Sequence, residues 1–222
     1  MTLNAKSTGD IRSKFNPLES GTYPARLLNV IDCGLQAQRP YQGQLKKPQP
    51  EILVTYELND EFMSDEAGDP DESKPRQISE YFPFYSLGAE LAKSTKRYNA
   101  LDPTGEFDGD WTKLIGLPIM LTIVQSPDRK DPTRIYENPT ALSTMRSKDV
   151  DKLSEMVGVS KLFDIDKPDM DAFNGLAPWM QKKIVANLEF EGSDLQKLIS
   201  GIEIADVEDV DTPESSLGDL AY

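Results

Sequence analysis

Apolar and polar residues alternate most regularly over residues 51–58. Side chains of a β-strand point alternately to its two faces, so this period of two predicts a strand with a buried face. That face consists of Ile52, Val54, Tyr56 and Leu58. Residues 22–32 are rich in apolar and β-branched residues and end before Gly34, which predicts an earlier strand. The connection over residues 35–50 is rich in Gln and Pro, so we expect a long loop there.

Three further strands and one helix follow along the chain. Residues 77–84 alternate again and predict a third strand, and residues 86–99 predict a helix with Ser86 as its N-cap. Residues 118–125 and 133–138 predict two more strands joined by a polar turn. The resulting order, β-β-β-α-β-β, is that of an OB-fold, a five-stranded barrel that binds oligonucleotides on one face and between its long loops. The sequence therefore predicts a mainly β fold with α-helices, built on an OB-fold-like barrel.

Helical spacing dominates the part of the chain after the fifth predicted strand. A first set of apolar residues at this spacing is Val150, Leu153 and Val157. This set stops at Gly158, and Pro178 opens a second predicted helix. A third helix begins with the capping-box pair Ser193 and Gln196. These helices are able to pack on the barrel or on another subunit. A homo-oligomer is therefore one of the possible states of the protein.

These patterns divide the chain into four parts. Residues 1–20 are expected to form a flexible polar segment. Residues 21–146 form the OB-fold-like barrel, with a disordered acidic insertion near residues 59–75, and residues 147–202 form a helical appendage. Residues 203–222 hold seven carboxylates and no Lys or Arg. Such a segment has too little apolar surface to offset the entropy of ordering, so we expect a disordered acidic tail.

The formal net charge of −14 is concentrated in two blocks. Besides the tail, residues 57–72 hold eight acidic residues and no basic one. Outside the two blocks, 23 acidic residues stand against 24 basic ones, so the remaining chain is close to neutral. The overall acidity is therefore no argument against a polyanionic ligand.

The residue types exclude several kinds of chemistry. The chain has no His and a single Cys, Cys33, which excludes Ser-His and Cys-His mechanisms, His-ligated metals and an internal disulfide. No Gly-rich phosphate-binding loop is present. The Asp residues within residues 164–171 lack the spacing of a calcium-binding loop, so we expect neither a metal nor another cofactor. Cys33 lies in a strand-like run and is expected to be a small buried side chain.

A protein that binds single-stranded nucleic acid needs aromatic rings for the bases and cations for the phosphates in one groove. The loop over residues 35–50 combines both kinds of side chain and would border the binding face of an OB-fold. Its candidates are Arg39, Tyr41, Lys46 and Lys47. Further candidates elsewhere are the aromatics Tyr81, Tyr85 and Tyr136 and the cations Lys93, Lys96, Arg97 and Arg134. The alternative is an ordinary solvated loop in which Tyr41 folds back on the barrel, whereas Trp111 is expected in the core.

Three segments of the chain resemble one protein family. They are YPARLLNVIDCGLQAQRPYQGQLKKPQPEILVTYEL (residues 23–58), LIGLPIMLTI (114–123) and LAPWMQKKIVANLEFEGSDL (176–195). Together they look like a family of tailed-bacteriophage proteins regarded as OB-fold single-stranded DNA-binding proteins. The resemblance implies single-stranded DNA as the ligand and no catalysis, and it assigns no individual contact residue.

The acidic tail is similar in kind to the tails of bacterial and phage single-strand binders, which commonly end in Phe and recruit replication or recombination proteins. Here the predicted partner-binding residues are Asp219, Leu220, Ala221 and Tyr222. A tail of this charge is also able to occupy the protein's own basic groove as a stand-in for a polyanion. The alternative is a solubilising tail without a partner.

The sequence thus predicts a non-enzymatic phage protein that coats single-stranded DNA in replication or recombination. Residues 1–20 lack the apolar run of a signal peptide, and no apolar stretch is long enough to cross a bilayer, so we expect a host-cytoplasmic protein without membrane contact. Two alternatives remain. One is a structural or interaction protein, such as an assembly factor, that uses the barrel to hold proteins, and the other is a metal-dependent nuclease acting through carboxylates.

Overall fold

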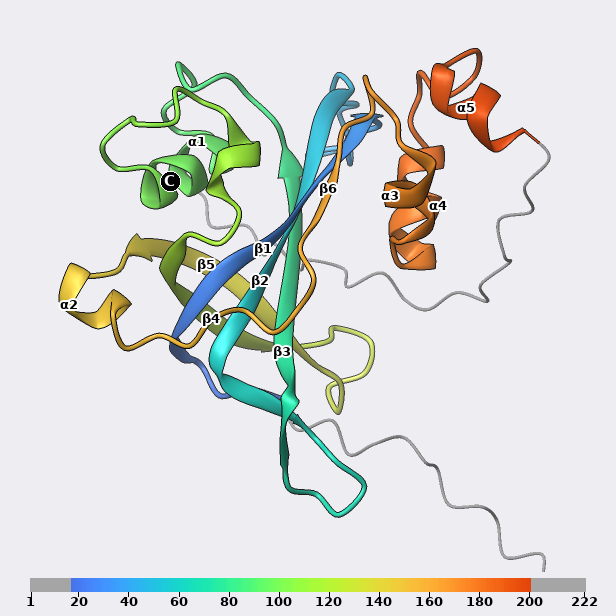
Figure 1. Cartoon of the computed structure of the whole chain (residues 1–222). Helices are drawn as coiled ribbons and strands as arrows, with labels where there is room; N and C mark the ends of the chain where they lie inside the picture. The colour runs from blue at the N-terminus through green and yellow to red at the C-terminus, as the bar shows by residue number, and fades with distance from the viewer. Residues whose placement is uncertain (1–16, 201–222) are drawn as a thin grey trace, which may run out of the picture.

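Strands dominate the fold between residues 17 and 200, the range that the structure, a computed structural model, describes (Figure 1). Within this range six strands form one sheet, flanked by five short α-helices and one 3-10 helix. The strands are β1 (Gly21–Gln36), β2 (Gln49–Ser64), β3 (Pro70–Pro83), β4 (Pro118–Pro127), β5 (Ile135–Thr144) and β6 (Lys161–Phe163). The helices are α1 (Lys93–Leu101), η1 (Trp111–Leu114), α2 (Ser147–Val150), α3 (Met170–Asn174), α4 (Pro178–Val185) and α5 (Asp194–Ile199).

The sheet has the order β3-β2-β1-β4-β5, and each neighbouring pair in this series is antiparallel. β6 lies outside the series and runs parallel to the middle of β1. In the register, Thr55 of β2 stands opposite Asn29 of β1 and Ser79 of β3. β3 and β5 are the two edges, and no backbone pairing joins them within the described range, so the sheet is open.

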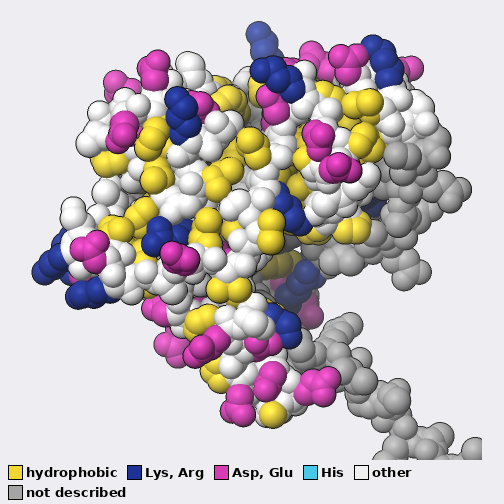
Figure 2. Space-filling view, in the orientation of Figure 1, with side chains coloured by type: hydrophobic (Ala, Val, Ile, Leu, Met, Phe, Trp, Pro, Cys, Tyr) yellow, Lys and Arg dark blue, Asp and Glu magenta, His cyan; other side chains and the backbone are white. Residues whose placement is uncertain are grey.

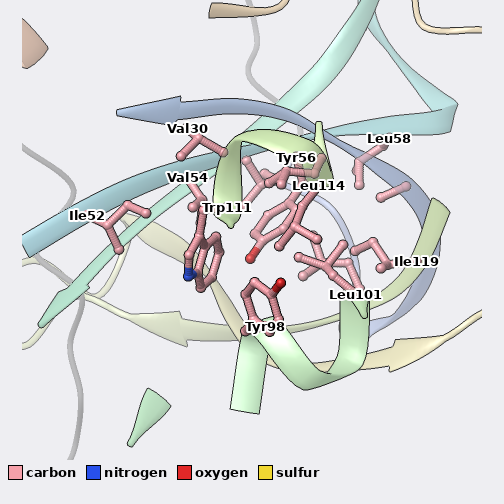
Figure 3. Close-up of a cluster of buried hydrophobic side chains, with 14 of the residues drawn as sticks. Val30, Ile52, Val54, Tyr56, Leu58, Tyr98, Leu101, Trp111, Leu114 and Ile119 are labelled. Atoms are coloured by element: carbon pink, nitrogen blue, oxygen red, sulfur yellow. The ribbon is translucent and has the colours of Figure 1, made fainter. Parts of the chain in front are cut away.

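One face of the sheet packs against α1 and η1 and forms what we call the inner core. The alternating residues of β2 point into it, as their period predicts. Trp111, only 5 % exposed, lies against Tyr98 with ring centroids 5.6 Å apart (Figure 3), which confirms that Trp111 is a core residue. The hydrophobic residues of the inner core are Leu18, Ala25, Leu27, Val30, Ile52, Val54, Tyr56, Leu58, Ile78, Phe82, Tyr98, Leu101, Trp111, Leu114, Ile119, Leu121 and Ile123.

Side chains connect the two edges of the sheet. Arg76 of β3 and Glu137 of β5 form an ion pair with Nη2 and Oε1 2.6 Å apart. Arg97 of α1 binds the carboxylate of Glu80 in β3 at 2.8 and 3.1 Å and donates to two backbone carbonyls of β5. Glu80 also accepts a 2.8 Å hydrogen bond from the hydroxyl of Tyr56, whose pKa is raised by burial and by this carboxylate. Charged groups thus hold β3 and β5 in place where backbone pairing is missing.

The opposite face of β1 and β2 is covered by the last part of the described chain, which builds the outer core. α3, α4 and α5 pack there beside β6 (Figure 1). α4 begins at Pro178, and the Ser193 hydroxyl accepts a 3.1 Å hydrogen bond from the backbone of Gln196, as the sequence predicts. The outer core consists of Ile31, Cys33, Leu53, Phe163, Phe173, Leu176, Met180, Ile184, Leu195 and Ile199. The burial expected for the single cysteine is confirmed.

An extended segment, residues 154–161, crosses the outer face of β1 and β2, and we call it the strap. The carboxylate of Glu57 accepts hydrogen bonds from the backbone N–H groups of Val157 at 2.8 Å and Gly158 at 2.7 Å. The side chain of Asn29 accepts a 2.9 Å hydrogen bond from the backbone of Lys161. A Cβ atom on Gly158 would collide with the Glu57 carboxylate, so the close approach of the strap requires glycine.

Residues 59–75 do not form the disordered insertion that their composition predicts. β2 continues to Ser64 and β3 begins at Pro70, so the acidic block is the end of a β-hairpin (Figure 1). In its turn, the Asp65 carboxylate accepts hydrogen bonds from three successive backbone N–H groups, each at 2.9 Å. An Asp side chain that bonds nearby backbone groups stabilises a turn. Local hydrogen bonding therefore orders a segment that has few apolar residues.

Two predicted helices are shorter than expected. α1 begins at Lys93, and residues 86–91 form turns instead, in which glycine at position 88 disfavours a helix. The apolar spacing from Val150 to Val157 gives only the four-residue α2, because the backbone of the strap binds Glu57 instead of continuing a helix. The fifth predicted strand, in contrast, is longer than expected, since β5 extends to Thr144.

Candidate nucleic-acid interface

The loop between β1 and β2 carries four of the predicted binding residues on the surface. Tyr41 and Gln44 form a β-bridge around Gln42 and Gly43, which have φ values of 50° and 77°. Positive φ at both central residues is typical of the two-residue turns that close hairpins. The loop therefore projects as a tight turn and does not fold back on the sheet. Arg39, Tyr41, Lys46 and Lys47 are all exposed in it.

Within this loop an aromatic ring and a cation are already paired. The ammonium of Lys46 lies 4.8 Å from the ring centroid of Tyr41, and this ring is 47 % exposed. A base stacked on the free face of such a ring would place its phosphates near Lys46 and Lys47. The structure thus brings the predicted aromatic and its predicted cations together in one loop.

Tyr81 lies on the outer face of β3, where its ring is partly covered. The ammonium of Lys183, from α4, stands 4.1 Å from the Tyr81 ring centroid and 2.7 Å from the carboxylate of Glu51. The Tyr81 ring also packs against the outer core. One of its faces is therefore occupied by the protein's own cation.

Arg97 is buried beside the inner core and Lys93 is partly covered, so neither belongs to an open binding surface. The side chain of Arg97 is 5 % exposed and is bound to Glu80 and to β5 carbonyls. Lys93 binds the same carboxylate at 2.7 Å and lies over the ring of Phe82. Sequence reasoning placed these cations on the surface because their acidic partner lies 13 and 17 positions away, in another element.

The end of β3 and the start of α1 form a second exposed aromatic region. Tyr85 is exposed, and its backbone N–H donates to the Ser94 hydroxyl at 3.2 Å. Lys96 is exposed on α1. Phe84, which the sequence reasoning missed, is 40 % exposed and packs its edge on Trp111. A large aromatic directly after an alternating strand was the available signal for Phe84.

Arg134 and Tyr136 lie at the turn between β4 and β5. The Tyr136 hydroxyl donates a 2.6 Å hydrogen bond to Asp128, and this bond, with two backbone N–H groups, lowers the pKa of Asp128 to about 2. The guanidinium of Arg134 lies 5.1 Å from the Tyr136 ring centroid. Figure 1 shows this turn and the β1–β2 loop at opposite ends of the sheet, so the two groups of candidates are not adjacent to each other.

A cleft of ≈ 470 Å³ opens on the outer face between these two ends. Its floor is made by β1, β2 and β3, and its walls are the strap and the start of α4. The lining residues are Leu28, Asn29, Thr55, Gln77, Ser79, Val159, Lys161, Ala177, Trp179 and Met180. Sequence reasoning did not single out Trp179. The available signal was its position beside, and not within, the apolar stripe formed by Met180 and Ile184 on α4.

Charge on this face of the molecule is mixed. Figure 2 shows Lys and Arg side chains scattered singly among acidic and apolar groups, whereas Asp and Glu gather on the hairpin of β2 and β3. The face in view has no continuous basic stripe. Any phosphate contacts on this face would therefore come from individual cations.

No helix in the part of the chain that the structure describes has the length and apolarity to cross a membrane. Within the same part, no three His, Cys, Asp or Glu side chains lie close enough to hold a metal ion. The predicted partner-binding residues Asp219, Leu220, Ala221 and Tyr222 lie outside the described residues. No protein-family model matches the chain, and no characterised protein or solved structure shows a significant similarity to it.

Proposed function

We propose that the protein binds single-stranded DNA without sequence preference and without catalysis, as a phage protein that coats the strand in replication or recombination. The observation that carries this proposal is the position of two cation-bearing loops at opposite ends of the sheet (Figure 1). The β1–β2 loop holds Arg39, Lys46 and Lys47, and the β4–β5 turn holds Arg129, Lys130 and Arg134. A strand lying along β3 would contact both.

The connectivity of the sheet supports an OB-fold-like barrel as the scaffold. An OB-fold is a partly open five-stranded Greek-key barrel, which binds oligonucleotides on the strand 2–3 face and with the loops after its first and fourth strands. Here β3 and β5 approach through Arg76 and Glu137, and α1 lies between β3 and β4 in the chain and bridges the two edges. The two cation-bearing loops are the loops after the first and fourth strands.

A second candidate function is an interaction protein that holds other proteins. The observation that favours it is the outer core, which covers the outer face of β1 and β2 and leaves a surface with mixed charge. For the single-strand binder, the acidic tail over residues 203–222 is proposed to recruit replication or recombination proteins.

The test is binding of fluorescent oligothymidine, compared with duplex DNA of equal length, over a series of salt concentrations. We expect tighter binding to the single strand and an affinity that falls steeply with salt, since phosphate contacts release counterions. The triple variant Tyr41→Ala, Lys46→Ala, Lys47→Ala should bind more weakly. Its log–log salt slope should become shallower by about 0.7 for each lost lysine contact.

The matched control is Lys148→Ala with Lys152→Ala, which also removes two exposed lysines but on and beside α2. This control should keep the wild-type affinity. Equal affinity for duplex DNA, or binding that does not respond to salt, contradicts the proposal. Absence of any DNA binding favours the interaction protein.

A further inference from the structure

We infer that the cleft between β3, the strap and α4 binds one unstacked nucleobase of the single strand, with Trp179 as the aromatic wall. This inference rests on the proposed function and assigns it a specific pocket. The cleft, of ≈ 470 Å³, lies on the outer face between the two cation-bearing loops. A strand that runs along β3 from one loop to the other would pass over it.

The floor of the cleft is polar, and hydrogen bonds fix several of its side chains. The hydroxyls of Thr55 and Ser79, on neighbouring strands, are 2.9 Å apart and share a hydrogen bond. Asn29 stands beside them on β1 and accepts a hydrogen bond from the backbone of the strap. Because Glu57 fixes the strap through two backbone N–H groups, this wall of the cleft is also held in place.

The polar groups of the cleft suit the edge of any base. Within residues 17–200 the side-chain amide of Gln77 makes no hydrogen bond, and it lies exposed at the cleft. An amide offers both a donor and an acceptor, and the partly exposed Ser79 hydroxyl can donate or accept by rotating. Such a set can meet the donor and acceptor pattern of each base without selecting one. This property fits a protein that coats DNA of any sequence.

The aromatic wall comes from α4. Trp179 is half-buried, packs against the outer core and also lines the cleft. An indole ring that is fixed on one side and accessible on the other gives a base a preformed stacking surface. The rest of the apolar lining comes from Leu28, Val159, Ala177 and Met180.

The charge of the cleft favours a base over a phosphate. Among its lining residues the one cation is Lys161, whose ammonium donates to the backbone carbonyl of Gly175. The carboxylate of Glu57 lies nearby under the strap and would repel a phosphate. A second hollow, of ≈ 490 Å³ beside α2, has no aromatic ring, and its cations Arg146 and Lys152 both pair with Asp149. Of these two hollows, the first combines an aromatic wall with adaptable polar groups, and the second does not.

Tryptophan fluorescence tests this inference directly, because the chain has two tryptophans. Trp111 is buried in the inner core, so Trp111→Phe leaves Trp179 as the sole reporter. Titration of this variant with oligothymidine should quench its emission. An oligomer of the same length in which all sites are abasic should not quench it. In the matched variant Trp179→Phe, the remaining Trp111 should keep its emission when oligothymidine binds.

Affinity provides a second measurement. Trp179→Ala should weaken oligothymidine binding about 5- to 150-fold, the range of one lost base–aromatic stack. Gln77→Ala, which removes an exposed side chain without a partner, should weaken it about 2- to 10-fold. The Gln77 variant keeps the test valid if loss of Trp179 disturbs the outer core.

The outcomes separate this inference from the proposed function. If wild-type protein binds oligothymidine while Trp179 is not quenched and Gln77→Ala binds normally, the base pocket is overturned and single-strand binding stands. Quenching by the abasic oligomer to the same degree also overturns it, since bases are then not needed. If wild-type protein binds no single-stranded DNA at all, both proposals fall.

Discussion

The inner and outer cores lie on opposite faces of β1 and β2, yet they are built differently. The inner core packs the four strands β1, β2, β3 and β4 against α1 and η1. It includes the buried ion pair between Glu80 and Arg97. The outer core joins short stretches of β1 and β2 to four elements that all follow residue 160. Its helices α3, α4 and α5 have five, eight and six residues, too few to be stable in isolation. The inner core thus holds the sheet together, whereas the outer core is a layer that depends on the sheet.

This difference predicts that damage to the inner core unfolds the whole protein. Glu80→Ala leaves the buried guanidinium of Arg97 without its carboxylate, and removal of one partner from a buried ion pair costs about 3–5 kcal/mol. We expect the free energy of unfolding in urea to fall by this amount, with the loss of sheet and helix signals in one transition.

Lys93→Ala is the matched control, since Lys93 binds the same carboxylate from a partly exposed position. It should cost no more than about 1 kcal/mol. If Glu80→Ala and Lys93→Ala cost the same, the Glu80–Arg97 pair does not have the role assigned to it in the inner core.

Damage to the outer core should release its helices before the sheet unfolds. Ile184→Ala removes a fully buried side chain of α4 and should weaken the packing of this layer by about 2–5 kcal/mol. The single cysteine reports the release, because Cys33 lies in the outer core and burial raises the pKa of its thiol to about 12. At pH 8 we expect slow alkylation of the wild type and much faster alkylation of the variant.

Leu188→Ala, at an exposed leucine just after α4, should leave the alkylation rate unchanged. An Ile184→Ala protein in which Cys33 reacts only during global unfolding would show that the two cores form one cooperative unit.

Polar contacts with Glu57 and Asn29 hold the strap on the outer face of β1 and β2, and a single added methyl group should disturb them. Gly158→Ala places a Cβ against the Glu57 carboxylate, and overpacking of this kind costs about 1–3 kcal/mol. Gly88→Ala, at a glycine with open surroundings and no positive φ, is the control and should be neutral. Thermal unfolding measures both. Equal melting temperatures for the two variants would contradict the tight contact between the strap and Glu57.

The smallest expected effect is a pH dependence at the edge of the outer core. Burial raises the pKa of Asp32, and the carboxylates of Asp164 and Asp166 add to this shift against the hydrogen bond from Gly34. Below the ordinary value of 3.8, Asp32 is protonated in both the folded and unfolded states. As pH rises through the folded pKa, the native state must hold an unfavourable charge and loses stability. Asp32→Asn should therefore be more stable than the wild type at pH 7 and equal to it at pH 3.

Asp194→Asn should have the opposite effect on stability: it should be less stable than the wild type at pH 7. Its hydrogen bond to Lys197 lowers the pKa of Asp194, so the wild-type carboxylate stabilises the fold at neutral pH and loses this contribution in acid. Chemical denaturation of both variants at pH 7 and pH 3 measures the change in the free energy of unfolding and so tests both expectations. A gain for Asp32→Asn at pH 3 as large as at pH 7 would exclude titration of Asp32 as the cause.

The sequence by itself determined five of the six strand-forming segments, their order and the position of the helix between the third and fourth strands, but it did not predict β6. It also determined that Trp111 and Cys33 are buried and that α4 and α5 begin at Pro178 and after Ser193. These features follow from periodicity, capping residues and turn residues, which act over a few positions. The exposed cation-aromatic loop between β1 and β2 was predictable for the same reason.

Only the tertiary structure decided which candidates remain available. In the folded protein, Arg97 and Lys93 form ion pairs with Glu80. The ammonium of Lys183 lies over the ring of Tyr81, and Trp179 lines a cleft. The tertiary structure also ordered the acidic block as a hairpin and laid the strap on Glu57. Whether a charged or aromatic side chain is free depends on the partners that packing brings to it from distant parts of the chain. Local sequence patterns do not predict those partners.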